Sequence, residues 1–139
     1  KRLYQTGLRG LNLGIETFHE KAARLIEKPF SGDRAKDFLL KLHYDILEEN
    51  TVINTGMIIG LPHETMDSVK RTVDWFKNEG KCIIPNWNVL MIPCPTRAPK
   101  NSLYQSKFAR NAEKYGLRWP TDNYLYWEHD TRIQTYGES

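Results

Sequence analysis

Cysteine is scarce in this sequence: Cys82 and Cys94 are the only two among its 139 residues. Two thiols are too few for the disulfide framework of a small secreted domain. Neither cysteine stands at a zinc-site spacing from any of the four histidines. The sequence also lacks a secretory signal, a low-complexity tract and an apolar run of membrane-spanning length. These absences predict a cytoplasmic protein with no membrane partner.

The charge of the chain is also modest. The net charge is +3, with 40% hydrophobic and 27% charged residues, and the basic residues are spread along the chain rather than clustered. This composition is typical of one modest globular domain with a solvated surface, and by itself it does not indicate a nucleic-acid-binding protein. The first residue is Lys1 rather than Met, so we expect the chain to be a fragment of a longer protein.

A strand is expected over residues 11–15, followed by a helix. In "TFHE", Thr17 and Glu20 have the spacing of a capping box, and Pro29 would stop the helix. A second, longer helix is expected from a cap at Ser31 or Asp33 to about residue 49. Its apolar residues recur on one side: Ala35, Phe38, Leu39, Leu42 and Ile46.

The second half of the chain continues the alternation of strands and helices. We predict a strand over residues 51–60, a helix over 65–80 closed by Gly80, and a strand over 82–92 whose pairing Pro85 confines to its second half. A last helix would end at Gly116.

The order β-α-α-β-α-β-α predicts an α/β fold of parallel strands joined by right-handed crossovers. Three parallel strands cannot close a barrel, and their outer edges would stay unpaired. We therefore expect about three strands of a partial (β/α)6, TIM-like barrel in residues 1–100, and a helix with an aromatic-rich extension in 101–139. The expected partner is a missing N-terminal half of the same protein, and the isolated segment should self-associate.

Two corners, where a strand gives way to a helix, carry candidate site residues. In "LGIE", Glu16 follows the first strand. There it could face a ligand, or its negative charge could only interact favourably with the dipole of the next helix. In "TGMIIGLPHET", Gly60 and Pro62 end the second strand abruptly. Corners of this kind in α/β proteins are usual ligand sites.

Together, "NLGIETFHEKAARLIEKPF" and "INTGMIIGLPHETMDSVKRTVDWFKNEG" resemble the middle of a radical SAM domain. The similarity covers residues 7–96 and is greatest to the branch that contains methylthiotransferases, coproporphyrinogen dehydrogenase and cobalamin-binding enzymes. It implies an enzyme that reductively cleaves S-adenosylmethionine at a 4Fe-4S cluster and generates a 5′-deoxyadenosyl radical. The cofactors would be S-adenosylmethionine and that cluster, and no substrate or catalytic residue is indicated.

The resemblance also implies a set of cofactor-binding residues. Glu16 would accept hydrogen bonds from the ribose hydroxyls, and Lys28 would pair with the methionyl carboxylate. Gly56 and Gly60 would let the cofactor approach the backbone, since Gly60 has no Cβ, and Ile58 would lie against the adenine. Lys28 could equally be a cation at a helix end, and Ile58 a core residue.

The chain departs from the family pattern in three places. His63 stands where relatives usually have glycine, and "PCPTR", which contains Cys94, lacks the glycine of the family's next loop. The three-cysteine loop that holds the cluster is absent, so this segment is expected to hold no metal. The cluster ligands should lie outside it.

Two other functions stay open. The chain could belong to a different (β/α)-barrel enzyme that binds a phosphorylated ligand at the same strand ends. Alternatively, it could be a non-catalytic fragment or an RNA-binding module that uses its basic, aromatic tail. In this tail, the segment "RWPTDNYLYWEHDTR" contains the aromatic residues Trp119, Tyr124, Tyr126 and Trp127.

Overall fold

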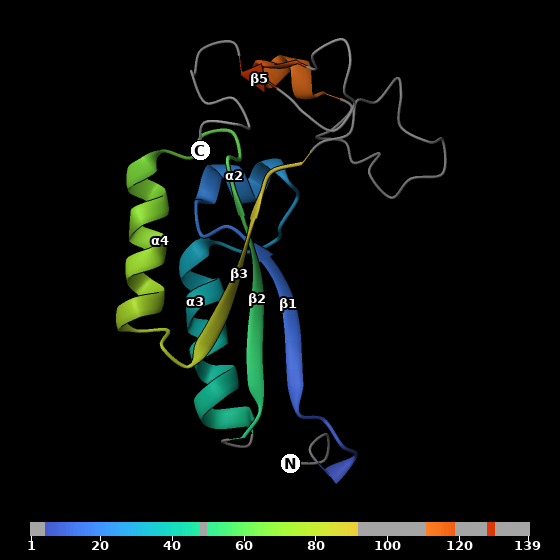
Figure 1. The fold of residues 1–139 in the computed structure, drawn as a ribbon, viewed down its shortest axis with the longest axis vertical. Coiled ribbons are helices and arrows are strands. Elements are labelled where there is room, and N and C mark those ends of the chain that lie inside the picture. The colour runs from blue at the N-terminus through green and yellow to red at the C-terminus, as the bar shows by residue number, and fades with distance from the viewer. Residues whose placement is uncertain (1–4, 48–49, 92–110, 119–127, 130–139) are drawn as a thin grey trace. The chain divides into compact units, whose positions relative to one another are not determined.

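A three-stranded parallel sheet with the strand order β1-β2-β3 organises the first part of the chain (Figure 1). This computed structural model describes residues 5–47, 50–91, 111–118 and 128–129. The chain divides into two units, Lys1–Asn88 and Val89–Ser139, each of which is described by itself. No helix in the described ranges has the length and apolar character needed to cross a membrane.

The strands are β1 (Gly10–Glu16), β2 (Val52–Ile59) and β3 (Ile83–Val89). Each covers an apolar stretch that the sequence predicted to be a strand. Pro85 is the third residue of β3. Because β3 is an outer strand of the described sheet, a residue without an N–H group is tolerated there.

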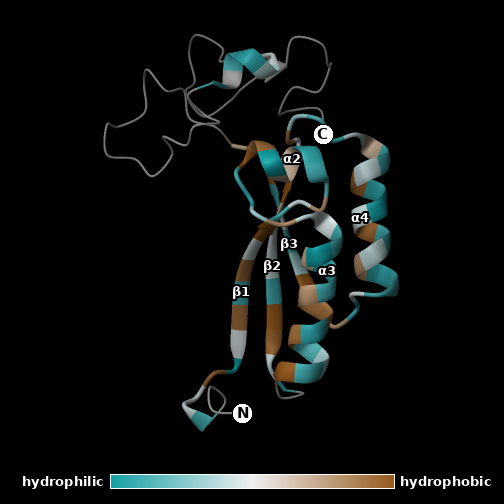
Figure 2. Ribbon diagram, turned by 180° about the vertical axis from the view of Figure 1, so that it is seen from behind, coloured by the Kyte–Doolittle hydropathy of each residue, from teal (hydrophilic) through white to brown (hydrophobic). Residues whose placement is uncertain are grey.

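Side chains alternate between the two faces of the sheet, and in β1 hydrophobic residues alternate with polar residues or glycine (Figure 2). Ile15, Ile53 and Met57 are buried on one face. The other face presents Asn12 opposite Asn54 and a glycine pair beyond them. One face therefore forms the core, and the second face carries the two asparagines and the glycine pair.

Three helices and a π-helical turn follow the strands: α2 (Glu20–Leu25), α3 (Gly32–Lys41), η1 (Leu42–Ile46) and α4 (Met66–Asn78). The helix that was expected to run to about residue 49 therefore ends at Ile46, and its last turn is π-helical. Ser31 caps α3 as predicted, because its side chain accepts a hydrogen bond from Arg34 N. The prediction for the start of α2 was wrong, since His19 and not Thr17 is its N-cap.

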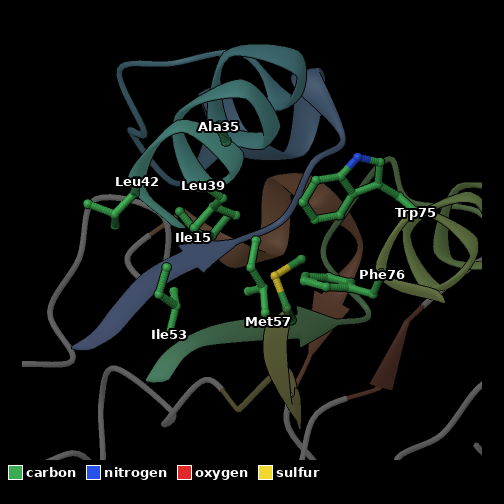
Figure 3. Packing of buried hydrophobic residues seen from close by; sticks show 9 residues of the cluster. Ile15, Ala35, Leu39, Leu42, Ile53, Met57, Trp75 and Phe76 are labelled. Atoms are coloured by element: carbon green, nitrogen blue, oxygen red, sulfur yellow. The ribbon is translucent and has the colours of Figure 1, made fainter. Parts of the chain in front are cut away.

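Helices α3 and α4 pack on the same face of the sheet and share one core with it (Figure 3). Trp75 and Phe76 of α4 meet edge to face, with ring centroids 5.0 Å apart. The predicted apolar side of the second helix was only partly right, because Phe38 and Ile46 are about half exposed. The buried members of the core are Ile15, Ala35, Leu39, Leu42, Ile53, Met57, Trp75, Phe76 and Ile83.

Gly80 follows α4 for a reason that the sequence did not show. It has no left-handed backbone, but a Cβ built on it would lie 2.6 Å from the ring of Trp75. The glycine therefore provides space for the indole rather than a special turn.

The second unit contains the described residues of the C-terminal region. A 3-10 turn, η2 (Ala112–Tyr115), precedes β4 (Leu117–Arg118), which pairs antiparallel with β5 (Glu128–His129). The predicted last helix falls mostly outside the described residues. The same holds for the loop that contains Cys94 and for the aromatic residues of 119–127.

Candidate functional site

The parallel strands β1 and β2 end side by side, and a facing pair of glycines lies at that end. Gly14 and Gly56 are partners in the register, and the next pair, Glu16 with Met57, follows a bulge. A Cβ built on Gly56 would be 3.9 Å from the Cα of Gly14. The two glycines thus leave a patch of bare backbone on the face of the sheet opposite the core.

Glu16 lies directly over this patch. Its backbone has φ of +71°, a left-handed conformation that is uncommon outside glycine and that accompanies the bulge. Its carboxylate approaches both glycines: Oε1 lies 2.6 Å from a Cβ built on Gly14, and Oε2 lies 3.9 Å from one built on Gly56. Gly14 therefore gives the carboxylate the room it occupies.

Lys28 reaches the same place from the loop after α2. Its Nζ donates a hydrogen bond to Gly14 O at 2.7 Å and lies 3.6 Å from Glu16 Oε1. Each of the two side chains keeps about a quarter of its surface exposed. An anion and a cation are thus held together at the strand ends, and both remain accessible to a ligand.

The other two predicted site residues continue along β2. Ile58 is two residues after Gly56, so its side chain lies on the same face, and it is partly buried. Gly60 follows the strand with φ of +96°, a conformation for which glycine has no steric penalty. The structure thus brings together Glu16, Lys28 and Gly56, and it places Ile58 and Gly60 on the continuation of the same strand.

A buried hydrogen bond joins the two corners that follow β1 and β2. Thr17 Oγ1 donates to Glu64 Oε1 at 2.6 Å, and Leu61 N donates to Glu64 Oε2 at 3.2 Å. His19 N in turn donates to Thr17 Oγ1 at 2.9 Å. Burial raises the pKa of Glu64, although the bonds from Thr17 and from the backbone act in the opposite direction. This Thr17–Glu64 brace fixes the corner of Glu16 against the corner of Gly60.

No family model, curated protein or solved structure matches this chain. The function must therefore be argued from the geometry. In the described part of the chain, no group of three or more histidine, cysteine or acidic residues could hold a metal ion. Cys82 is a free, partly buried thiol there, and one thiolate cannot hold an iron–sulfur cluster.

Sequence reasoning missed two parts of this region. Gly14 and the Thr17–Glu64 brace depend on a bulge and on a contact between residues 47 positions apart, which no local motif indicates. It also missed a cleft of about 490 Å³ lined by basic side chains from four segments. The signal available for that cleft was His63, a histidine in the corner that follows β2.

Proposed function

We propose that this chain supplies part of the S-adenosylmethionine site of a radical SAM enzyme. The observation that carries the proposal is the pairing of Glu16 and Lys28 over the facing glycines Gly14 and Gly56. S-adenosylmethionine presents two ribose hydroxyls and a carboxylate. A carboxylate side chain suits the first group, an ammonium group suits the second, and bare backbone suits the close approach of both.

The arrangement of the sheet supports the same proposal. The strands follow in the order β1-β2-β3, and the helices that connect them pack on one face only. A doubly wound sheet would carry helices on both faces, whereas a barrel has them all outside. In a partial (β/α)6 barrel the opposite face, with Asn12, Asn54 and the glycine pair, would line the interior.

The unpaired edges are consistent with a partial barrel as well. β1 has a strand neighbour on one side only in the described sheet. Beside it, an apolar cavity of about 500 Å³ lies between the strand and α3, lined in part by Leu13, Phe30 and the half-exposed Phe38. Further strands supplied by a missing half of the protein would pair with these edges and cover this apolar surface.

The residues of this chain would bind and orient the cofactor. Because the ribose and the carboxylate of one molecule are separated, Lys28 would leave Glu16 when both groups bind. Bound S-adenosylmethionine supplies the adenosyl group for radical chemistry. A 4Fe-4S cluster does not fit the cysteines of this chain, so the residues that hold it would lie elsewhere in the protein.

Gly56→Ala tests the proposal in the longer protein that contains this chain. A Cβ on Gly56 meets its nearest neighbours at 3.9 Å or more, which is ordinary van der Waals contact, so the fold should tolerate it. The same methyl group would stand in the path of the cofactor. We expect S-adenosylmethionine binding in equilibrium dialysis to weaken at least tenfold, with little change in the thermal unfolding temperature.

Gly10→Ala is the matched control, since Gly10 lies on the same face at the other end of β1 and its Cβ would also have room, 3.5 Å from Val52 O. It should leave cofactor binding unchanged. A second variant, Glu16→Ala, should weaken binding about tenfold to a hundredfold, because it removes charge-assisted hydrogen bonds worth about 1.5–3 kcal/mol. Unchanged affinity in both Gly56→Ala and Glu16→Ala would refute the assignment of this site.

A further inference from the structure

A basic cleft lies over the ends of β1 and β2 on the helical side of the sheet. Its volume is about 490 Å³, and helices α2, α3 and α4 and the corner after β2 all contribute to its lining. Five of the lining residues carry basic side chains: His19, Lys21, Lys36, His63 and Arg71. The cleft is separate in composition from the Glu16–Lys28 pair, with which it shares no residue.

The positive charge of this cleft is poorly neutralised by the protein. Glu20, the acidic residue of the lining, forms an ion pair with Arg24, which lies outside it. Lys36 Nζ lies over the ring of Phe18, 5.3 Å from its centroid, and its ion pair with Asp33 is long, at 3.8 Å, with an Asp33 side chain that is 94% exposed. Within the described residues, neither Lys21 nor Arg71 has an ion-pair partner within 4 Å. A cleft with unpaired cations from separate segments attracts an anion.

The imidazole rings add hydrogen-bond donors to the cations. His19 Nδ1 accepts from Ala22 N at 3.3 Å, so the proton of the neutral ring is on Nε2, which leaves that N–H free to donate. Burial lowers the pKa of His19, and the charges of His63, Lys21 and Arg71 lower it further, whereas Glu20 acts in the opposite direction. This repulsion between basic groups would be relieved by a bound anion.

His63 occupies this position at a conformational cost. Its φ is +73°, a left-handed conformation that is uncommon outside glycine, although histidine adopts it more often than most other residues do. Glycine would fit this corner without strain. A ring is nevertheless placed there, and it lines the cleft.

We propose that this basic cleft binds the phosphate group of a small organic phosphate. Arginine, lysine and imidazole N–H groups together match the several oxygens and the double negative charge of a phosphate monoester. The volume lies within the range of small-molecule sites and far exceeds a bare phosphate ion. Phe18, held by its contacts with Trp75 and Phe76, provides an apolar wall for the organic part.

The ligand of this cleft is chemically distinct from the proposed cofactor. S-adenosylmethionine has a net positive charge, because its sulfonium and ammonium groups outnumber its carboxylate, and the cleft would repel it. A small phosphate also fits better than a nucleic acid, since the net charge of the whole chain is only +3. The proposal therefore stands whether or not the cofactor site is as proposed.

The test is a titration of the full chain with phenyl phosphate, followed by NMR of backbone amides. We expect saturable shifts at residues of the cleft, and none with phenol, which lacks the charge. Arg71→Gln should weaken binding about two- to fivefold, the loss typical of one exposed ion pair. Lys70→Gln removes the same charge from the adjacent, exposed position of α4, which does not line the cleft, and it should bind as the wild type does.

A second variant separates binding from folding. His63→Gly keeps the left-handed corner and removes the ring, so it should weaken phenyl phosphate binding without lowering the unfolding temperature. Three results would overturn the proposal: no saturable binding, equal losses in Arg71→Gln and Lys70→Gln, or a single-stranded RNA that competes for the same amides with a steep salt dependence. The last result would assign the cleft to a nucleic acid instead.

Discussion

Replacing Thr17 by valine should destabilise the chain by an amount that depends on pH. Valine has nearly the same shape, but it loses the hydroxyl that donates to Glu64 and accepts from His19 N. A hydrogen bond to an ionised partner contributes about 1.5–3 kcal/mol, and a neutral one contributes about 1 kcal/mol. Both groups are buried, with Thr17 2% and Glu64 7% exposed. The expected loss is therefore about 3 kcal/mol when Glu64 is ionised.

The pH dependence follows from the raised pKa of Glu64. The native state holds the Glu64 proton at a pH where the unfolded chain has released it, so this group lowers stability as the pH rises from about 4.5 to the native pKa. At pH 8 the Thr17 hydroxyl offsets part of that penalty, whereas at pH 4.5 it meets a neutral carboxyl group. The loss in Thr17→Val should thus fall to about 2 kcal/mol at pH 4.5.

Urea unfolding at pH 4.5 and pH 8, followed by the fluorescence of the buried Trp75, would measure both values. Thr17→Ser is the control: it keeps the hydroxyl and should show a smaller loss, equal at the two pH values. In a Glu64→Gln background the Thr17→Val loss should also become independent of pH. If the loss in Thr17→Val itself is the same at both pH values, the hydroxyl is not bonded to an ionisable carboxyl group and the reasoning is wrong.

Three further substitutions test other parts of the structure. Gly80→Ala should destabilise the chain by about 1–3 kcal/mol, because the new methyl group overlaps Trp75; an unchanged urea midpoint would contradict this steric role. Thr55→Val should raise stability by about 1 kcal/mol, since Thr55 is fully buried and its hydroxyl has no hydrogen-bond partner, and a lower midpoint would reveal a bond that the valine cannot form. Because the lowered pKa of His19 makes the native state release a proton that the unfolded chain keeps, stability should fall as the pH drops through 6.5. His19→Asn keeps a capping oxygen, so its thermal unfolding should show a shallower fall between pH 7.5 and 5.5, and equal slopes in the two proteins would exclude His19 as the source.

Much of the fold could be predicted from the sequence because its signals are local. Apolar runs located the three strands, and Ser31 was one of two predicted caps, because its acceptor role involves a neighbour three residues away. The prediction of a capping box at Thr17 was wrong for the opposite reason. The Thr17 hydroxyl donates to Glu64, a contact that only the tertiary fold creates. A local capping pattern does not predict the partner of a hydroxyl group when a distant, buried carboxylate competes for that hydroxyl.

The candidate site, like the fold, could be predicted from the sequence only in part. A family resemblance predicted Glu16, Lys28 and Gly56 as cofactor-binding residues, and in the structure they lie together at the strand ends. Gly14 and the basic cleft were missed. The role of Gly14 depends on how the bulge turns Glu16 back over the sheet, and the cleft gathers basic residues that are scattered along the sequence. Neither feature leaves a periodic pattern or a motif.

The Thr17–Glu64 brace also has a consequence for the order of folding. Its two residues are 47 positions apart, so closing that loop costs about 3 kcal/mol of chain entropy before any contact compensates for it. The short helices and their caps can form without this cost, and the pairing of β1 with β2 cannot. We therefore expect the brace to form after the rate-limiting step of folding. Weakening it should leave the folding rate nearly unchanged and speed up unfolding, so the two corners of the site would be the first parts of the sheet to open.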